Sequence, residues 1–127
     1  RDSGVVNSII QKFWQDFLRL AEVHVVDGAD LLDVGGSKAG PGPEVTEADE
    51  MERVVPAIAA LRERFDLPIA VDTFRGSVAD AAMEAGACVG NDISGFADPS
   101  FLPACARHGA AVIATHVRIG PRSWMCQ

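Results

Sequence analysis

Four polar side chains that could do chemistry each follow a short apolar run: Asp33, Asp72, Asn91 and His116. An ionised carboxylate at the end of a buried run costs desolvation free energy unless it is paired or binds something, so Asp72 is the strongest candidate. The amide of Asn91 offers both donors and an acceptor. Together, such a carboxylate and amide on neighbouring strand ends can recognise the edge of a planar, nitrogen-rich ring. His116 is given a supporting role only, because a lone histidine at a strand end is more often simply hydrogen-bonded.

A glycine-rich stretch, Gly35 to Pro43, follows the first of these runs and contains Lys38. Such a loop can bind phosphate through its backbone N–H groups, and Lys38 would add a positive charge facing an anionic ligand. The stretch is neither GxGxxG nor a Walker A motif, so the nucleotide-binding motifs are absent. Asp33, just before the glycines, either supports a ligand from the pocket floor or ties down the glycine loop. Asp92 either points into the space enclosed by a barrel or caps the following turn.

These residues are placed by a unit that occurs four times: an amphipathic stretch runs to a Gly or Pro, and a short apolar run follows. The apolar runs predict strands at Ala29–Val34, Leu67–Val71, Ala87–Asn91 and Ala110–Thr115. Strands that alternate with helices indicate βαβ units and a parallel sheet, here with four adjacent strands in chain order. The polar strand ends then share one edge. That edge binds ligands both in barrels and in open doubly wound sheets, so the pattern alone does not separate the two.

Helical periodicity predicts the intervening helices at Gln11–Val26, from Thr46, at Gly76–Glu84 and at Pro99–Arg107. The second of them has the clearest start, because Thr46 is a good N-cap and Glu47 and Glu50 load the first turn with negative charge. Pro56 lies inside this helix and is expected to bend or split it.

Composition excludes several classes of protein. The chain has 127 residues, of which 48% are hydrophobic and 23% charged, so it can bury a core as one domain or a piece of one. The net charge of −7 and the scattered Lys and Arg argue against a basic surface that binds nucleic acid. No apolar run approaches the ~20 residues of a membrane span. The three cysteines form no CxxC pair or His/Cys cluster, so no metal ligand is assigned and reduced cytoplasmic thiols are expected.

Five motifs, in order, resemble a known family. They are GADLLDVGG at 28–36, RVVP at 53–56, IAVDT at 69–73, NDISG at 91–95 and THVR at 115–118. Their order, spacing and residue identities resemble the dihydropteroate synthase family of pterin-binding barrels, in particular its divergent actinobacterial-type members. We accordingly divide the chain into an unrecognised N-terminal helical segment (1–22), a partial pterin-binding barrel domain (23–122) and an unrecognised tail (123–127).

The resemblance implies an α/β fold of the (β/α)8 TIM-barrel type, of which this chain supplies about strands two to five. It implies a cytoplasmic transferase of folate biosynthesis that condenses 6-hydroxymethyl-7,8-dihydropterin pyrophosphate with 4-aminobenzoate. Asp72 and Asn91 match family positions that hold the pterin, with Asp33, Lys38 and His116 in support. The resemblance also implies Mg²⁺, whose usual Asn ligand is not in this chain, and it allows a homodimer when the protein is full length.

The chain departs from the family at Ser37-Lys38-Ala39-Gly40, where the family loop usually carries Glu-Ser-Thr-Arg. The usual Thr and Arg contacts to substrate are therefore missing, and Lys38 supplies charge without the bidentate geometry of Arg. Two alternatives remain: a pterin-binding methyltransferase that uses a methyl-folate and a corrinoid, or a non-catalytic pterin-binding paralogue. The strands expected to carry the lysine, the arginine and the metal-binding Asn of the family are not in the chain. We therefore assign no catalytic residue and expect the fragment alone to be inactive.

Overall fold

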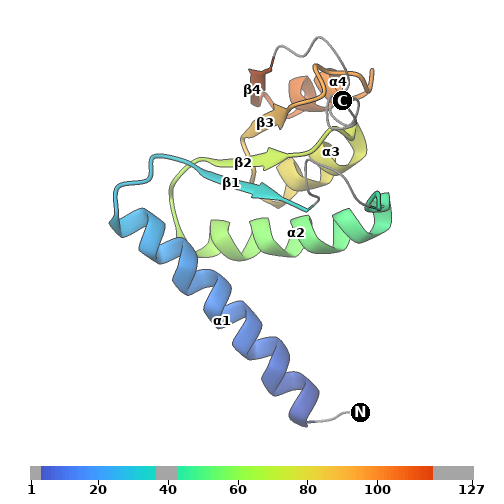
Figure 1. Ribbon diagram of the computed structural model, residues 1–127. Coiled ribbons are helices and arrows are strands. Elements are labelled where there is room, and N and C mark those ends of the chain that lie inside the picture. The colour runs from blue at the N-terminus through green and yellow to red at the C-terminus, as the bar shows by residue number, and fades with distance from the viewer. Residues whose placement is uncertain (1–3, 37–42, 116–127) are drawn as a thin grey trace, which may run out of the picture. The chain divides into compact units, whose positions relative to one another are not determined.

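The computed structural model describes residues 4–36 and 43–115, so the hypotheses on Lys38 and His116 lie outside the described residues. Within these ranges, helices and strands alternate strictly along the chain (Figure 1). In chain order they are α1 (Gly4–Val26), β1 (Leu32–Gly35), α2 (Glu47–Arg64), β2 (Ile69–Asp72), α3 (Gly76–Ala85), β3 (Val89–Asp92), α4 (Phe101–Arg107) and β4 (Ala111–Ala114).

The four strands form one sheet in the order β1-β2-β3-β4, and every neighbouring pair is parallel. This confirms the predicted arrangement of adjacent parallel strands in chain order. The first strand begins later than predicted, at Leu32 rather than Ala29. The reason is local: the N–H of Ala29 still bonds to the carbonyl of His24, and Gly28 turns the chain with a φ of 102°, so these residues complete the end of the helix.

Helices α2, α3 and α4 pack on one face of the sheet and cover β1, β2 and β3 there, whereas all residues of β4 are exposed (Figure 1). The side chains that are completely buried between these helices and the strands are Val54, Ile58, Ile69, Val71, Val78, Ala79, Ala82, Phe101 and Ala104. Contact is closest over β3, where a Cβ on Gly90 would lie 2.8 Å from Cys105 Sγ and 3.0 Å from Phe101 Cζ. A side chain at this position would therefore push α4 off the sheet.

Helix α2 starts as the sequence predicts and continues past Pro56. The Thr46 hydroxyl accepts a hydrogen bond from the N–H of Asp49 at 3.1 Å, which confirms the N-cap. The expectation that Pro56 could split the helix is wrong, because α2 is continuous from Glu47 to Arg64. Proline removes one N–H donor, but the buried contacts of Val54 and Ile58 on either side of it hold both halves against the same core.

Residues 1–30 form a compact unit separate from residues 31–127. The predicted first helix is confirmed and begins earlier, at Gly4. Along it, Phe13, Trp14 and Phe17 make successive edge-to-face ring contacts, with centroids 5.3 and 5.6 Å apart. No described helix has the length and apolar character that crossing a bilayer requires.

Candidate functional site

The strand register brings Asp33, Asp72 and Asn91 together at one end of the sheet, on the face opposite the helices. Gly35 is paired with Asp72, and Asp72 with Asn91. Residues paired in a parallel sheet point to the same face, and Asp33 shares that face because it precedes Gly35 by two positions. Asn91 Nδ2 lies 3.4 Å from Asp33 Oδ2, a long hydrogen bond. The predicted common edge therefore exists for these three residues.

The environment of Asp72 disfavours its charged form. Burial, followed by the negative charges of Asp33, Asp92 and Glu50, raises the pKa of Asp72 to about 6. Burial also raises the pKa of Asp33, although the hydrogen bond from Asn91 works in the opposite direction. A ligand that donates N–H groups or carries positive charge would relieve this repulsion. The site is thus suited to a nitrogen-rich, hydrogen-donating edge rather than to an anion.

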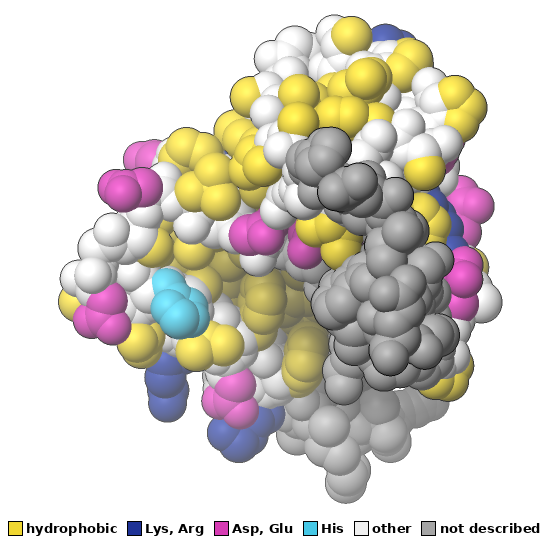
Figure 2. All heavy atoms as spheres, turned by 45° about the horizontal axis from the view of Figure 1, so that its top comes forward, with side chains coloured by type: hydrophobic (Ala, Val, Ile, Leu, Met, Phe, Trp, Pro, Cys, Tyr) yellow, Lys and Arg dark blue, Asp and Glu magenta, His cyan; other side chains and the backbone are white. Residues whose placement is uncertain are grey.

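Figure 2 is turned by 45° so that the top of Figure 1 comes toward the viewer. Acidic side chains stand there among hydrophobic ones. Gly35 leaves space at the sheet edge that Asp33, Asp72 and Asn91 share, which we call the ligand edge. A Cβ on Gly35 would lie 3.4 Å from Asp72 Cβ and 3.7 Å from Asp72 Oδ2. A larger side chain at Gly35 would occupy the approach to the Asp72 carboxylate.

Asp92 is directed away from this edge. Its Oδ1 accepts the N–H of Ser94 at 2.8 Å and its Oδ2 accepts the N–H of Phe96 at 3.1 Å. The turn needs this support because Gly95 and Phe96 both have positive φ, 76° and 64°. Of the two predicted roles of Asp92, the cap of the following turn is confirmed. Asp92 is fully buried, and because it follows Asn91 it lies on the helix side of the sheet rather than on the side of Asp72 and Asn91.

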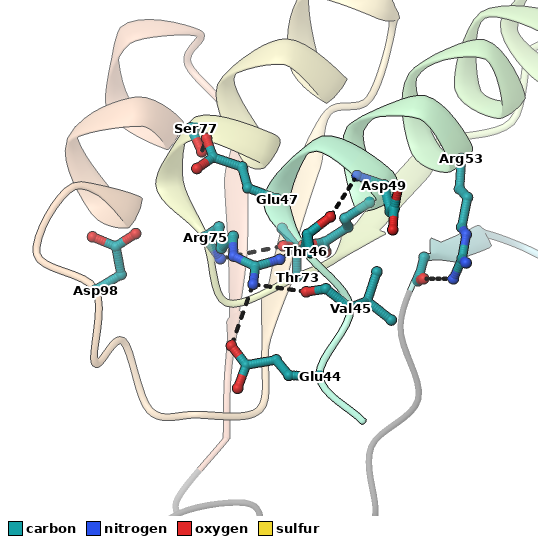
Figure 3. A network of polar contacts seen from close by, with 12 residues as sticks. Glu44, Val45, Thr46, Glu47, Asp49, Arg53, Thr73, Arg75, Ser77 and Asp98 are labelled. Atoms are coloured by element: carbon teal, nitrogen blue, oxygen red, sulfur yellow. Dashed lines mark hydrogen bonds and ion pairs between the residues drawn. The ribbon is translucent and has the colours of Figure 1, made fainter. Parts of the chain in front are cut away.

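A polar network centred on Arg75, which the sequence pattern did not predict, lies beside this edge (Figure 3). Arg75 Nη1 lies 2.6 Å from Glu50 Oε1, and Arg75 Nη2 donates to the Val45 carbonyl at 2.9 Å. The Arg75 N–H donates to Thr73 Oγ1 at 3.2 Å, which joins the network to the end of β2. The available signal was Glu50 itself, a charged residue four positions before Val54 and therefore on the buried face of α2.

The residue that precedes the undescribed part of the glycine-rich stretch, Gly36, is held by α2. Its carbonyl accepts a hydrogen bond from Arg53 Nη1 at 3.1 Å. A Cβ on Gly36 would lie 2.9 Å from Val54 Cγ2 and 3.1 Å from Glu50 Cγ, so only glycine fits without displacement. This close approach explains the second glycine of the pair in terms of packing.

A metal site is not evident in the part of the chain that the structure describes. Residues 4–36 and 43–115 contain no group of three or more His, Cys, Asp or Glu side chains that could hold a metal ion. The described residues therefore do not fit the Mg²⁺ that the family resemblance implies.

Comparison with known proteins supplies the remaining evidence. The family model described as "Pterin binding enzyme" matches residues 2–127, a longer range than the five motifs cover. The dihydropteroate synthase of Synechocystis is 40% identical over 124 residues, which are 96% of this chain and 41% of that protein. The Bacillus subtilis enzyme is 41% identical over 100 residues, covering 77% of this chain and 35% of its own length.

Solved structures agree. The chain superposes on Yersinia pestis dihydropteroate synthase, in a complex with a sulfonamide drug, with a TM-score of 0.80 and 37% identity, over 87% of this chain and 40% of that one. It matches the Burkholderia cenocepacia enzyme, complexed with 7,8-dihydropteroate, with a TM-score of 0.77 and 39% identity, over 85% and 39% of the two chains. The chain thus spans about two fifths of the length of these relatives.

These relatives have the TIM-barrel fold, and the parallel sheet in chain order is a consecutive part of it. The expectation of a partial (β/α)8-type α/β fold is therefore confirmed. The chain belongs to the pterin-binding enzyme family, as a dihydropteroate synthase-type member.

Proposed function

We propose that the complete protein carrying this segment is a dihydropteroate synthase-type transferase, and that the segment supplies the edge that holds the pterin ring. The single observation that carries the proposal is the register pairing of Asp72 with Asn91 on one open face of the sheet. Relatives at about 40% identity bear the same enzyme name, and one structural relative is complexed with 7,8-dihydropteroate.

The chemistry of the pair fits a pterin. The ring presents adjacent N–H donors beside a carbonyl acceptor. A carboxylate at Asp72 can accept the donors, while the Asn91 amide can donate to an acceptor and accept from a donor. The repulsion that raises the pKa of Asp72 to about 6 in the free site would be relieved by these donors, so binding should favour its ionised form. Holding the ring in this way contributes by orientation rather than by bond-making.

The same proposal covers what lies beyond the described residues. The second substrate would be 4-aminobenzoate, which a related structure from Thermus thermophilus contains. Lys38 and His116 would support the site. Mg²⁺, with ligands from outside this segment, a cytoplasmic location and a homodimer are proposed from the family resemblance alone.

Isothermal titration of the complete protein with pteroic acid tests the pterin edge. Wild type should bind, and Asn91→Ala should bind about tenfold to hundredfold more weakly, the cost of a lost hydrogen bond in a partly buried, charged site. Asp66→Asn is the matched control, because Asp66 is an exposed acid in the turn after α2. Wild-type protein that fails to bind pteroic acid, or an unchanged affinity in Asn91→Ala, would remove the basis of the proposal.

The departure at Ser37-Lys38-Ala39-Gly40 keeps one competing function open, a pterin-binding protein without synthase activity, either a methyltransferase or a non-catalytic paralogue. Complementation of a synthase-deficient strain by the full-length gene separates the two cases. Growth without added folate products supports the synthase, whereas pterin binding without growth supports the competing function.

A further inference from the structure

Arg75 connects three parts of the fold that are distant in sequence. It immediately precedes α3 and follows Asp72 by three positions. Its guanidinium pairs with Glu50 in the first turn of α2. It also contacts the chain just before that turn, where Nη2 donates to the Val45 carbonyl and lies 3.4 Å from Glu44 Oε2 (Figure 3). The guanidinium also stacks over the Phe74 ring at 4.8 Å. A planar fork is needed to satisfy these partners together.

The two arginines Arg53 and Arg75 hold the described residues on either side of segment 37–42. Arg53 binds the Gly36 carbonyl on one side, and Arg75 binds Val45 on the other. Glu50 lies between these two points, because Gly36 packs against its Cγ and Arg75 pairs with its Oε1. The chain that enters the glycine-rich stretch thus passes close to the Glu50 side chain, and the chain that leaves it is bound by the arginine that pairs with Glu50.

Glu50 is an unusual residue to find at this point. Its side chain is 0% exposed, against 16% for that of Arg75, so the pair is largely removed from water. Its second oxygen, Oε2, has no hydrogen-bond partner among the described residues. Replacing a buried ion pair by apolar residues of similar volume is often neutral or stabilising, so stability alone does not explain the presence of both members.

The charges that face Asp72 come from every element packed around it. Asp33 on β1, Asp92 on β3 and Glu50 on α2 are negative and raise its pKa. Arg75, at the start of α3, is the cation that contacts Glu50 directly. Arg75 therefore reduces the field that Glu50 exerts on Asp72 in addition to holding the backbone.

We propose that Arg75 is a positioning residue for the ligand edge, whose fork holds Glu50 and the chain leaving the glycine-rich stretch against the strand end that carries Asp72. The inference rests on the proposed function, since the ligand at Asp72 is taken to be a pterin. Arg75 touches no ligand in this scheme and acts through Glu50, Val45 and Thr73.

The test measures pteroic acid affinity from pH 5 to pH 8 in the complete protein, for wild type, Arg75→Lys, Glu50→Gln and the control Arg107→Met. Arg107 is a matched arginine on α4, 60% exposed and paired with Asp80 at the surface. Arg75→Lys keeps the charge, but one ammonium cannot hold Glu50 and Val45 together, so its affinity should fall about threefold to tenfold with an unchanged pH midpoint. Glu50→Gln removes a negative charge near Asp72, so the midpoint should move to lower pH.

Arg75→Lys and Glu50→Gln each keep a polar side chain at the substituted position, so both variants should fold. If Arg75 had a structural role only, the variants would lose thermal stability, but Arg75→Lys would not bind more weakly and Glu50→Gln would not shift the pH midpoint. The inference is overturned if Arg75→Lys binds as tightly as Arg107→Met, or if the midpoint of Glu50→Gln equals that of wild type. Failure of the wild type to bind pteroic acid would instead contradict the proposed function.

Discussion

Replacing Asp72 by Asn should make the protein more stable at neutral pH while weakening its ligand site. The substitution keeps the size and shape of the side chain and removes a charge that burial and three neighbouring acids disfavour. The same repulsion favours a ligand that donates hydrogen bonds to Asp72, so Asp72 lowers the stability of the folded protein and strengthens binding. Measuring both the gain in stability and the loss of ligand affinity is a stronger test than measuring either alone.

The size of the effect follows from the pKa of Asp72, about 6 in the folded protein against an ordinary value of 3.8. About two pKa units correspond to an upper limit of about 3 kcal/mol, since each unit is about 1.4 kcal/mol. The side chain is only half-buried, so solvent screening reduces this to about 1–2 kcal/mol. Below about pH 4 the group is protonated in both states and costs nothing. As the pH rises from about 4 to 6, the unfolded state loses its proton first and wild-type stability falls.

The advantage of Asp72→Asn should therefore grow between about pH 4 and 6 and stay constant above pH 7. Denaturant unfolding of wild type and variant at pH 4.5, 6 and 7.5 measures it, with Asp66→Asn as the exposed control. Pteroic acid affinity should fall about tenfold to hundredfold in the same variant. A variant that is less stable than wild type at pH 7.5, or a stability difference that does not depend on pH, would refute the reasoning.

Four further outcomes are expected. Asn91→Ala should lower pterin affinity more than His116→Ala, as titration of the complete protein would show. Thr46→Ala should cost about 1 kcal/mol of stability in denaturant unfolding, because it removes the N-cap hydrogen bond of α2. Gly90→Ala should cost about 1–3 kcal/mol, because its Cβ would lie 2.8 Å from Cys105 Sγ; an unchanged unfolding midpoint would contradict the packing argument. The isolated 127-residue chain should oligomerise or aggregate in size-exclusion chromatography, because β1 and β4 each pair on one side only within the described residues.

Local signals predicted the sheet and its polar edge well. The apolar runs identified all the described strands, and the polar residue after each run identified Asp33, Asp72 and Asn91 as neighbours. The boundaries were less accurate where backbone hydrogen bonds decide them, as at Ala29, which completes the preceding helix. The role of Asp92 could only be given as two options, because its orientation depends on a turn with two positive φ angles.

The Arg75 network could not be predicted in the same way. Arg75 is 25 positions from Glu50 and 30 from Val45, and the contacts arise only when α3 packs beside α2. The acidic first turn of α2 was correctly related to the helix dipole, but Glu50 has a second role as the buried partner of an arginine. A charged residue at an apolar position of a helix is the pattern that would have drawn attention to it.

The agreement between strand order and chain order has a consequence for biosynthesis. Each strand pairs with the one made just before it, so the growing chain can extend the sheet as it leaves the ribosome, without waiting for distant segments. Short separations between pairing partners also favour rapid association. We expect the contact between β2 and β3, and with it the neighbouring placement of Asp72 and Asn91, to form during translation, at a rate set by delivery of about 5–20 residues per second. Rare codons that pause synthesis after β3 would then leave Asp72 and Asn91 paired before β4 is made.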